Sequence, residues 1–286
     1  MQHPVTWLDV FTSVPLTGNA LAVVHDADGI DDQAMLAFAR ETRLSETTFV
    51  QAATDGRADY RNRIWTTTCE VPFAGHPSLG TAVAVARLRG EKSVRYVQQT
   101  DAGCQPVEVQ LDGFVARASI LQEQPSFGPK PDPVAVMRAA GLSAADADPT
   151  LPAQIVSTGL TNLLAPVRRE ALHRAAPPGR ETLRALLEPL GATVLYLAAV
   201  DPDAGAARAR GFLVDHAAIA EDPATGSAAG ELLAYLRERD GTSELTIEQG
   251  VEMGRPSRLE CTWVEDRPRV GGDVVIVAEG RLLLPV

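Results

Sequence analysis

Two short stretches rich in small residues decide the fold: GHPSLGTA at residues 75–82 and ATGSAAG at residues 224–230. Each opens a long run that is typical of a helix, and each follows a group of short strand-like segments. Glycine lets the backbone turn tightly before the first helical turn and lets a ligand approach the amides. The unpaired N–H groups and the dipole of a helix start attract anions. Two such starts directed at one cleft would hold a carboxylate without an arginine or a lysine.

The segments on either side of these stretches predict a duplicated α+β architecture. The proline- and glycine-rich stretch 122–133 separates two rounds of elements, and we place a domain boundary there. Before it, the pattern predicts helices over 31–42 and 77–89 and strands over 6–10, 20–24, 47–51, 60–65, 94–98, 107–110 and 115–120. After it, the pattern predicts helices over 133–140, 180–190 and 226–239 and strands over 154–157, 163–167, 193–198, 211–214 and from residue 244 onward.

Composition narrows the classes of function. The chain of 286 residues has a formal net charge of −11 and a pI near 5.0, which argues against binding to nucleic acid or an anionic membrane. Its three cysteines form no CxxC pair and its five histidines show no HExxH or HxH spacing, so we expect neither a disulfide framework nor a metal site. Residues 1–11 have no signal-peptide pattern, and the most apolar window, 192–200, is far too short to span a bilayer. We therefore expect a soluble, cytoplasmic protein.

Titratable residues lie beside both helix starts. His76 is at the first of them, where the positive helix end favours the neutral imidazole, and Asp222 and Ser227 flank the second. Glu46 lies in LSETTF, residues 44–49, between a predicted helix and a predicted strand. Partial burial there would raise its pKa and make it a workable general acid or base. Taken one at a time, these features also have ordinary explanations: a capped helix, a packed histidine, a solvated glutamate.

Taken together, the motifs resemble the PhzF (phenazine biosynthesis-like) isomerase family. The similarity rests on Asp9-Val10-Phe11, Gly18-Asn19, residues 44–49, PFAGHP at 72–77, EDPATGSA at 221–228, Gln249-Gly250, GRPS at 254–257, Gly271-Gly272 and Gly280. The matches run in order from residue 9 to the end of the chain. The sequence departs from the family pattern at Ala20, at TTTCE (residues 66–70) and at Val214, and the second departure leaves the substrate open.

The resemblance implies a diaminopimelate-epimerase-like α+β fold of two pseudo-symmetric lobes. Each lobe would have a curved, mostly antiparallel sheet wrapped around a central helix that starts at the interlobe cleft. We assign residues 1–124 to the N-terminal lobe, which a returning C-terminal strand, 274–286, completes, and residues 125–273 to the C-terminal lobe. The family further implies a homodimer, no cofactor and a small-molecule carboxylate as substrate.

Carried over residue by residue, the resemblance implies that Glu46 removes a proton from one carbon of the substrate and returns one to another. His76, Asp222 and Ser227 would line the site, orient the substrate and assist proton transfer. The implied substrate-binding residues are Gly18, Asn19, Ser45, Gly75, Thr225 and Gly226, with main-chain amides at the two helix starts holding the substrate carboxylate. The expected reaction is a cofactor-independent proton shift on a small, cyclic, unsaturated carboxylic acid.

Three other interpretations remain open from the sequence. A racemase or epimerase of an amino-acid-like substrate would need a thiol at each helix start, where this chain has Gly75-His76 and Gly226-Ser227. A non-catalytic carboxylate-binding protein on the same fold is less favoured, because a pure binder has no need of Glu46. A NAD or flavin enzyme is weaker still, since no GxGxxG motif follows a strand.

Overall fold

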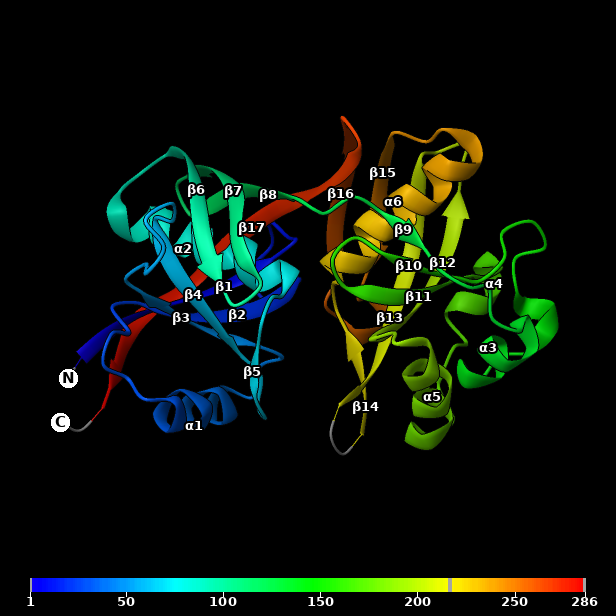
Figure 1. The fold of residues 1–286 in the computed structure, drawn as a ribbon, viewed down its shortest axis with the longest axis horizontal. Helices are drawn as coiled ribbons and strands as arrows, with labels where there is room; N and C mark the ends of the chain where they lie inside the picture. The colour runs from blue at the N-terminus through cyan, green and yellow to red at the C-terminus, as the bar shows by residue number, and fades with distance from the viewer. Residues whose placement is uncertain (1, 216–217, 285–286) are drawn as a thin grey trace. The chain divides into compact units, whose positions relative to one another are not determined.

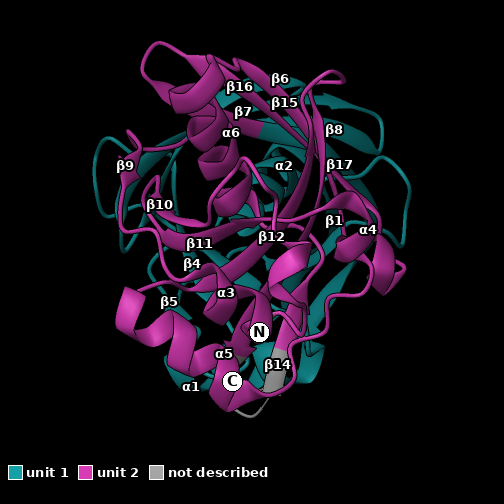
Figure 2. Ribbon diagram, turned by 90° about the vertical axis from the view of Figure 1, so that its right-hand side faces the viewer, with its two compact units in different colours: residues 1–121, 271–286 teal, residues 122–270 magenta. Residues whose placement is uncertain are grey.

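The computed structural model describes residues 2–215 and 218–284 and divides the chain into two compact units, shown as ribbons in Figure 1 and in separate colours in Figure 2. Unit 1 comprises residues 1–121 and 271–286, and unit 2 comprises residues 122–270. The sequence places these boundaries after residues 124 and 273. Of the return strand expected over 274–286, residues 285 and 286 lie outside the described part of the chain.

Unit 1 is a ring of strands that closes on itself. Its strands are β1 (Gln2–Val10), β2 (Asn19–Val24), β3 (Thr47–Gln51), β4 (Tyr60–Trp65), β5 (Glu70–Val71), β6 (Ser93–Thr100), β7 (Gly103–Asp112), β8 (Val115–Leu121) and, from Gly271 on, β17 (Arg267–Leu283). Pairing runs β1–β2–β3–β4–β6–β7–β8–β17 and returns to β1, while β5 lies on β4. Because β17 pairs with both β8 and β1, the ring has no open edge there.

Helix α2 (Gly75–Arg89) fills the inside of this ring (Figure 1). It contacts β1, β2, β3, β4, β6, β7 and β8, and each of its residues from 76 to 86 is buried. Small side chains make the fit possible: a Cβ on Gly80 would lie 2.6 Å from a methyl carbon of Leu21 and 2.8 Å from one of Leu8. A helix that is buried on all sides has no polar face, which is why its sequence shows no amphipathic pattern.

Helix α1 (Asp32–Thr42) packs on β3 and β4 through Met35 and Ala39, in a cluster with Phe49 and Trp65. Asp31 caps its first turn by accepting a hydrogen bond from the backbone N–H of Ala34 at 2.8 Å. The helix therefore begins one residue later than the sequence predicts.

Unit 2 has strands β9 (Ser126–Phe127), β10 (Gln154–Ser157), β11 (Thr161–Pro166), β12 (Val194–Asp201), β13 (Ala206–Asp215), β14 (Ala218–Asp222), β15 (Glu244–Gln249), β16 (Ser257–Val264) and the first residues of β17. Its helices are α3 (Pro133–Ala139), α4 (Arg169–Leu172), α5 (Arg180–Leu187) and α6 (Gly226–Asp240), with short 3₁₀ turns at Ala144–Asp146, Glu188–Leu190 and Val251–Met253. Helix α6 is buried from 228 to 236 and contacts β10, β11, β15 and β16. The predicted helix over 180–190 ends early because Pro189 lacks an N–H and closes it with a 3₁₀ turn.

The two units repeat one pairing pattern. The antiparallel pairs β1–β2, β3–β4 and β6–β7 of unit 1 correspond to β10–β11, β12–β13 and β15–β16 of unit 2. The parallel pairs β2–β3 and β4–β6 correspond to β11–β12 and β13–β15. A short strand, β5 or β14, precedes the buried helix in each unit. The duplication predicted from the two helix openings is therefore present in the order and direction of the strands.

Candidate active site

Three segments of unit 1 bring polar side chains to the start of α2. Asn19 is the first residue of β2, and Glu46 immediately precedes β3. Because β2 and β3 run parallel, with Ala22 opposite Thr47, the beginnings of both strands lie at the same end of the ring. His76 stands in the first turn of α2, between Gly75, the first helical residue, and Pro77.

These side chains form a row. The imidazole Nε2 of His76 lies 3.5 Å from Oε2 of Glu46, and its Nδ1 lies 3.2 Å from the side-chain amide Nδ2 of Asn19. The hydroxyl of Ser45 donates to Oδ1 of Asn19 at 3.5 Å. The His76 side chain is 6% exposed and that of Glu46 is 20% exposed. A buried imidazole and a carboxylate that still reaches solvent are therefore in contact.

The contacts among these side chains determine which nitrogen of His76 carries the proton. Burial lowers the pKa of His76 from 6.5 to about 3, so the imidazole is neutral near pH 7. With Ser45 donating to Oδ1 of Asn19, the Asn19 amide presents its N–H₂ group to Nδ1 of His76. The one imidazole proton then sits on Nε2, the nitrogen that faces Glu46. His76 therefore presents a neutral N–H to the carboxylate at 3.5 Å, without a hydrogen bond between these two atoms.

Buried hydrogen bonds fix the start of α2. The hydroxyl of Ser78 donates to the backbone oxygen of Ala74 at 2.7 Å and accepts from Gln98 at 2.8 Å, and Gln98 in turn accepts from Asn62 at 3.0 Å. Ala74, the residue before the helix, has no polar side chain with which to cap the first turn. The first-turn amides around Gly75 therefore keep the positive character that attracts an anion.

The two connections that carry Glu46 and Asn19 are tight. Arg43 ends α1 with a φ of 55°, and the hydroxyl of Thr42 bonds Thr47 at 2.9 Å, which holds the short link that contains Glu46. Gly18 has a φ of +66°, and a Cβ there would come within 2.5 Å of the backbone oxygen of Val10. Gly18 is thus required by the turn that leads into β2, and it sets the position of Asn19.

In unit 2, Asp222 belongs to a network before α6. The hydroxyl of Thr225 donates to Oδ2 of Asp222 at 2.8 Å, and Gln249 donates to the backbone oxygen of Asp222 at 2.7 Å and to the Thr225 hydroxyl at 2.9 Å. The Gln249 carbonyl oxygen accepts from the backbone N–H of Thr225 at 3.1 Å and from Tyr196 at 3.0 Å. Since the Thr225 hydroxyl serves Asp222, it does not cap α6.

Ser227 and Gly226 occupy the first turn of α6. The side-chain amide of Asn162 donates to the Ser227 hydroxyl at 3.2 Å, and Gln122 donates to the backbone oxygen of Gly226 at 2.9 Å. Ser227 is half-buried, whereas its neighbours on both sides are buried. The sequence did not single out Asn162 or Gln122, and Gln249 entered only through the resemblance of its Gln-Gly motif.

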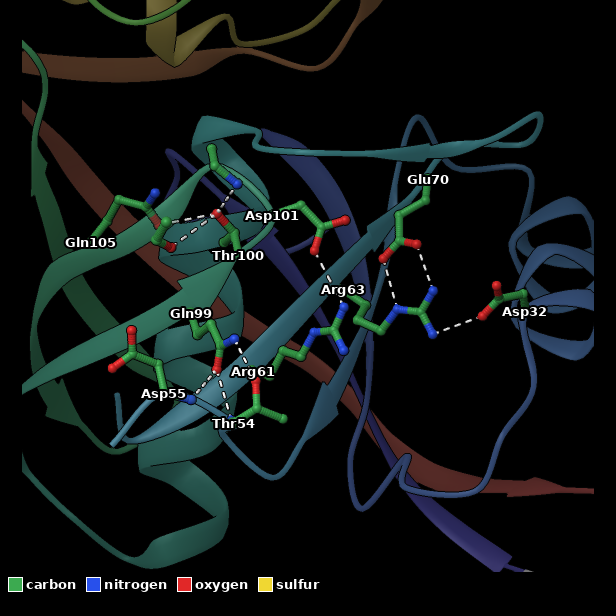
Figure 3. Close-up of polar contacts among 12 residues, drawn as sticks. Asp32, Thr54, Asp55, Arg61, Arg63, Glu70, Gln99, Thr100, Asp101 and Gln105 are labelled. Carbon is green, nitrogen blue, oxygen red and sulfur yellow. Dashed lines mark hydrogen bonds and ion pairs between the residues drawn. The ribbon is translucent and has the colours of Figure 1, made fainter. Parts of the chain in front are cut away.

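The stretch TTTCE at 66–70 forms a braced surface turn. Figure 3 shows Arg63 of β4 between Glu70 of β5, which it bonds at 2.7 Å and 2.5 Å, and Asp32 of α1, at 2.8 Å. The backbone N–H of Cys69 donates to the hydroxyl of Thr66 at 3.1 Å, and the Cys69 side chain is exposed. This cluster is structural, because each charge in it is used to hold the turn.

The cysteines do not occupy the helix starts. Cys104 is on β7 and Cys261 is buried on β16, and burial raises the pKa of both thiols. A raised pKa reduces the thiolate fraction that a thiol-based racemase needs. Among residues 2–215 and 218–284, no group of three or more His, Cys, Asp and Glu side chains is arranged to hold a metal ion, and no helix is long and apolar enough to cross a membrane.

Strands packed around a buried helix in each unit define a protein of the diaminopimelate-epimerase-like fold, the fold predicted from the sequence. A family model described as "Phenazine biosynthesis-like protein", PhzC-PhzF, matches residues 8–280, and the chain belongs to this family.

Relatives of known sequence and structure agree with this assignment. An uncharacterized isomerase of Mesorhizobium japonicum is 36% identical over 96% of this chain and 97% of its own. The trans-2,3-dihydro-3-hydroxyanthranilate isomerase of Pseudomonas aeruginosa is 34% identical over 99% of this chain and 100% of its own. The solved structure of a predicted epimerase from Pseudomonas aeruginosa is 38% identical, covers 99% of this chain and 100% of its own, and superposes with a TM-score of 0.87. The chain is therefore an isomerase of the PhzF-like type.

Proposed function

We propose that this isomerase catalyses a cofactor-independent proton shift on a small, cyclic, unsaturated carboxylic acid, with Glu46 removing and returning the proton. The observation that carries the proposal is the contact between Glu46 and a neutral His76 at 3.5 Å. The Glu46 carboxylate lies beside a neutral N–H group, and it still reaches solvent and hence a bound ligand.

The reaction follows from this arrangement in two steps. The Glu46 carboxylate takes a proton from a carbon conjugated with the substrate's carboxylate, and the electron pair of the broken C–H bond moves into the conjugated system. The amides at the start of α2 stabilise the negative charge that develops. Glu46, now protonated, returns the proton to a different carbon, and the double bond has moved. No redox partner is consumed, because one proton leaves and one proton returns while the electron pair stays in the substrate.

Unit 2 supplies the second part of the proposal. Asp222 and Ser227 are proposed to orient the substrate, with Thr225 and Gly226 forming the polar helix start beside them. Two facts support this role: the network of Thr225 and Gln249 fixes Asp222, and Asn162 fixes Ser227. The 34% identical relative named as a trans-2,3-dihydro-3-hydroxyanthranilate isomerase makes a cyclic, unsaturated amino acid of that type the first compound to try.

The test is deuterium incorporation in heavy water, followed by NMR. The protein is incubated with a dihydro-hydroxyanthranilate and a panel of other cyclic unsaturated acids, beside Glu46→Gln and the control Glu41→Gln, an exposed glutamate of α1. We expect exchange or isomerisation with the wild type and Glu41→Gln, and a loss of about a hundredfold or more in Glu46→Gln. A folded Glu46→Gln enzyme with wild-type turnover would contradict the role of Glu46.

Binding without chemistry is the competing outcome. If a compound raises the melting temperature but no proton exchanges, the protein is a carboxylate binder, because a ligand stabilises the state that binds it. If no compound in the panel is either bound or converted, the proposed class of substrate is wrong.

A further inference from the structure

Two buried threonine hydroxyls join the ring of unit 1 to the helix inside it. Thr48 is the second residue of β3 and Thr81 belongs to α2, and their Oγ1 atoms lie 2.8 Å apart, so one hydroxyl donates to the other. Both residues are 0% exposed. Two valines would have the same shape without the cost of burying polar groups, so a hydroxyl pair at this place calls for a physical explanation.

The alternation of side chains along β3 connects this pair with Glu46. Thr47 bonds the last residue of α1, and Phe49 packs edge-on against a ring of α1, so both face outward from the ring of strands. Thr48 lies between them and faces α2. Glu46 stands two residues before Thr48, and side chains two residues apart share a face of a strand. The contact of Glu46 with His76 agrees with this inward direction.

The same two segments are therefore joined at two points. Glu46 contacts His76 of α2, and two residues further on Thr48 bonds Thr81, five residues further along α2. Two residues advance a strand by about 7 Å, and five residues advance a helix by about 7.5 Å. Because the two contacts are similarly spaced along both segments, the hydroxyl bond fixes how the chain that carries Glu46 lies along the helix that carries His76.

A hydrogen bond fixes this position better than apolar packing does. Apolar contacts, such as those of Leu8 and Leu21 beside Gly80, have no preferred direction. A hydroxyl pair has a preferred distance and angle. Without it, Thr81 can return its hydroxyl to a carbonyl of its own helix, so α2 would stay folded while β3 shifted along it.

We propose that the hydroxyl pair of Thr48 and Thr81 is a positioning device that sets the separation between Glu46 and His76. The two threonines act through the strand and the helix to which they belong, and neither needs to touch the substrate. A displacement of about 1 Å at a reacting group can cost about a hundredfold in rate. The inference rests on the proposed function for the chemistry of Glu46, and on the contacts of β3 with α2 for the rest.

The experiment compares Thr48→Val, Thr48→Ser and the double variant Thr48→Val with Thr81→Val. Thr6→Val is the matched control, because it removes another buried hydroxyl of unit 1, which bonds His25 at 2.9 Å. We expect Thr48→Val to lose about tenfold or more in kcat with KM within about twofold, since the alignment of an acid–base group acts mainly in the transition state. Thr48→Ser keeps the hydroxyl and should stay within about twofold of wild-type kcat, and so should Thr6→Val.

The double variant separates position from stability. Two valines fill the space of two threonines and leave no hydroxyl unpaired, so we expect a melting temperature close to that of the wild type while kcat stays about tenfold lower. A bond that served only the fold would give the reverse, a less stable Thr48→Val enzyme with full kcat. Full kcat in the folded double variant overturns the proposal. So does an equal loss of kcat in Thr48→Ser or in the control.

Crystal structures supply a readout that needs no substrate. The distance between Oε2 of Glu46 and Nε2 of His76 should change by about 0.5 Å or more in Thr48→Val and in the double variant, and it should be kept in Thr48→Ser and Thr6→Val. If no acid is turned over but this distance behaves as expected, only the proposed reaction fails. If the distance is the same in all the variants, the hydroxyl pair does not position Glu46.

Discussion

The amide nitrogen of Asn19 lies 3.2 Å from Nδ1 of His76, on the side of the imidazole opposite Glu46. Asn19 thereby occupies the nitrogen that would otherwise carry the proton, and the proton is directed to the nitrogen that faces the carboxylate. One amide at the start of a strand determines whether Nε2 presents a proton or a lone pair to Glu46.

This relationship predicts the effect of Asn19→Asp. The two side chains have the same shape, but a carboxylate cannot donate, so it draws the imidazole proton to Nδ1 and leaves a lone pair on Nε2 facing Glu46. We expect the melting temperature to change little and turnover to fall about tenfold or more. Nitrogen chemical shifts of the His76 ring report which nitrogen is protonated. An Asn19→Asp enzyme with unchanged turnover would show that the tautomer is not important for the reaction.

Two of the buried histidines, His25 and His76, predict a loss of stability in mild acid. Burial lowers the pKa of His76 to about 3 and that of His25, which contacts the Thr6 hydroxyl at 2.9 Å, to about 4, against 6.5 for each when exposed. Between these values and 6.5 only the unfolded chain takes up the protons, so the free energy of unfolding falls as the pH drops below about 6.5 and is unaffected above it. At pH 5 each histidine should cost about 2 kcal/mol relative to pH 8.

Urea unfolding at pH 8 and pH 5 measures this difference. His25→Gln and His76→Gln should each reduce the gap between the two pH values by about 2 kcal/mol, whereas His173→Gln, at an exposed position, should leave it unchanged. The idea is wrong if both buried variants keep the full wild-type gap.

The close contacts around Gly80 limit the size of the side chain that α2 can carry at this position. A methyl group there would approach Leu21 and Leu8 to 2.6 Å and 2.8 Å, so both of these fully buried side chains must shift. We expect Gly80→Ala to lower the free energy of unfolding by about 1–3 kcal/mol, although alanine favours a helix more than glycine does. Gly56→Ala, at a site with open space and no positive φ, is the matched control. Equal stability of the two variants would show that the ring adapts easily.

A substitution at Gly211 tests whether the hydrogen bonds that hold Asp222 matter for turnover. A Cβ at this position would lie 2.7 Å from the Thr225 hydroxyl and 3.3 Å from Nε2 of Gln249, the two groups that hold Asp222. We expect Gly211→Ala to reduce turnover about tenfold or more by displacing Thr225, with a smaller effect on the melting temperature. A variant that loses stability but keeps full turnover would indicate that the network serves only the fold.

Much of the architecture was predictable because its signals are local. The strand over 47–51 and the helix that ends before Gly90 follow from alternation, helix periodicity and a glycine at the helix end. The strands β5, β9 and β14 were not predicted, because segments of a few residues become strands only through their pairing partners. The closure of the ring through β17 follows from no pattern within that strand and entered only through the resemblance.

The residues of the candidate site likewise fall into those that the sequence indicated and those that it did not. Glu46 and His76 were selected from their places at element junctions and from the family motifs, and the structure puts them in contact. Asn162, which is 65 positions from Ser227 in sequence, gave no signal. Its contact with Ser227 joins partners distant in the chain, which cannot be obtained from local spacing.

The pairing of β1 with β17 has a consequence for how the chain is made. Residues 122–270 are continuous, so every strand of unit 2 is synthesised before residue 283. Unit 1 must wait, with its N-terminal strand unpaired on one side, until Leu283 can align with Gln2. During that interval β1 presents an open edge that a chaperone or another nascent chain can reach. The order of translation therefore exposes the half of the enzyme that contains Glu46 and His76 for longer than the other half.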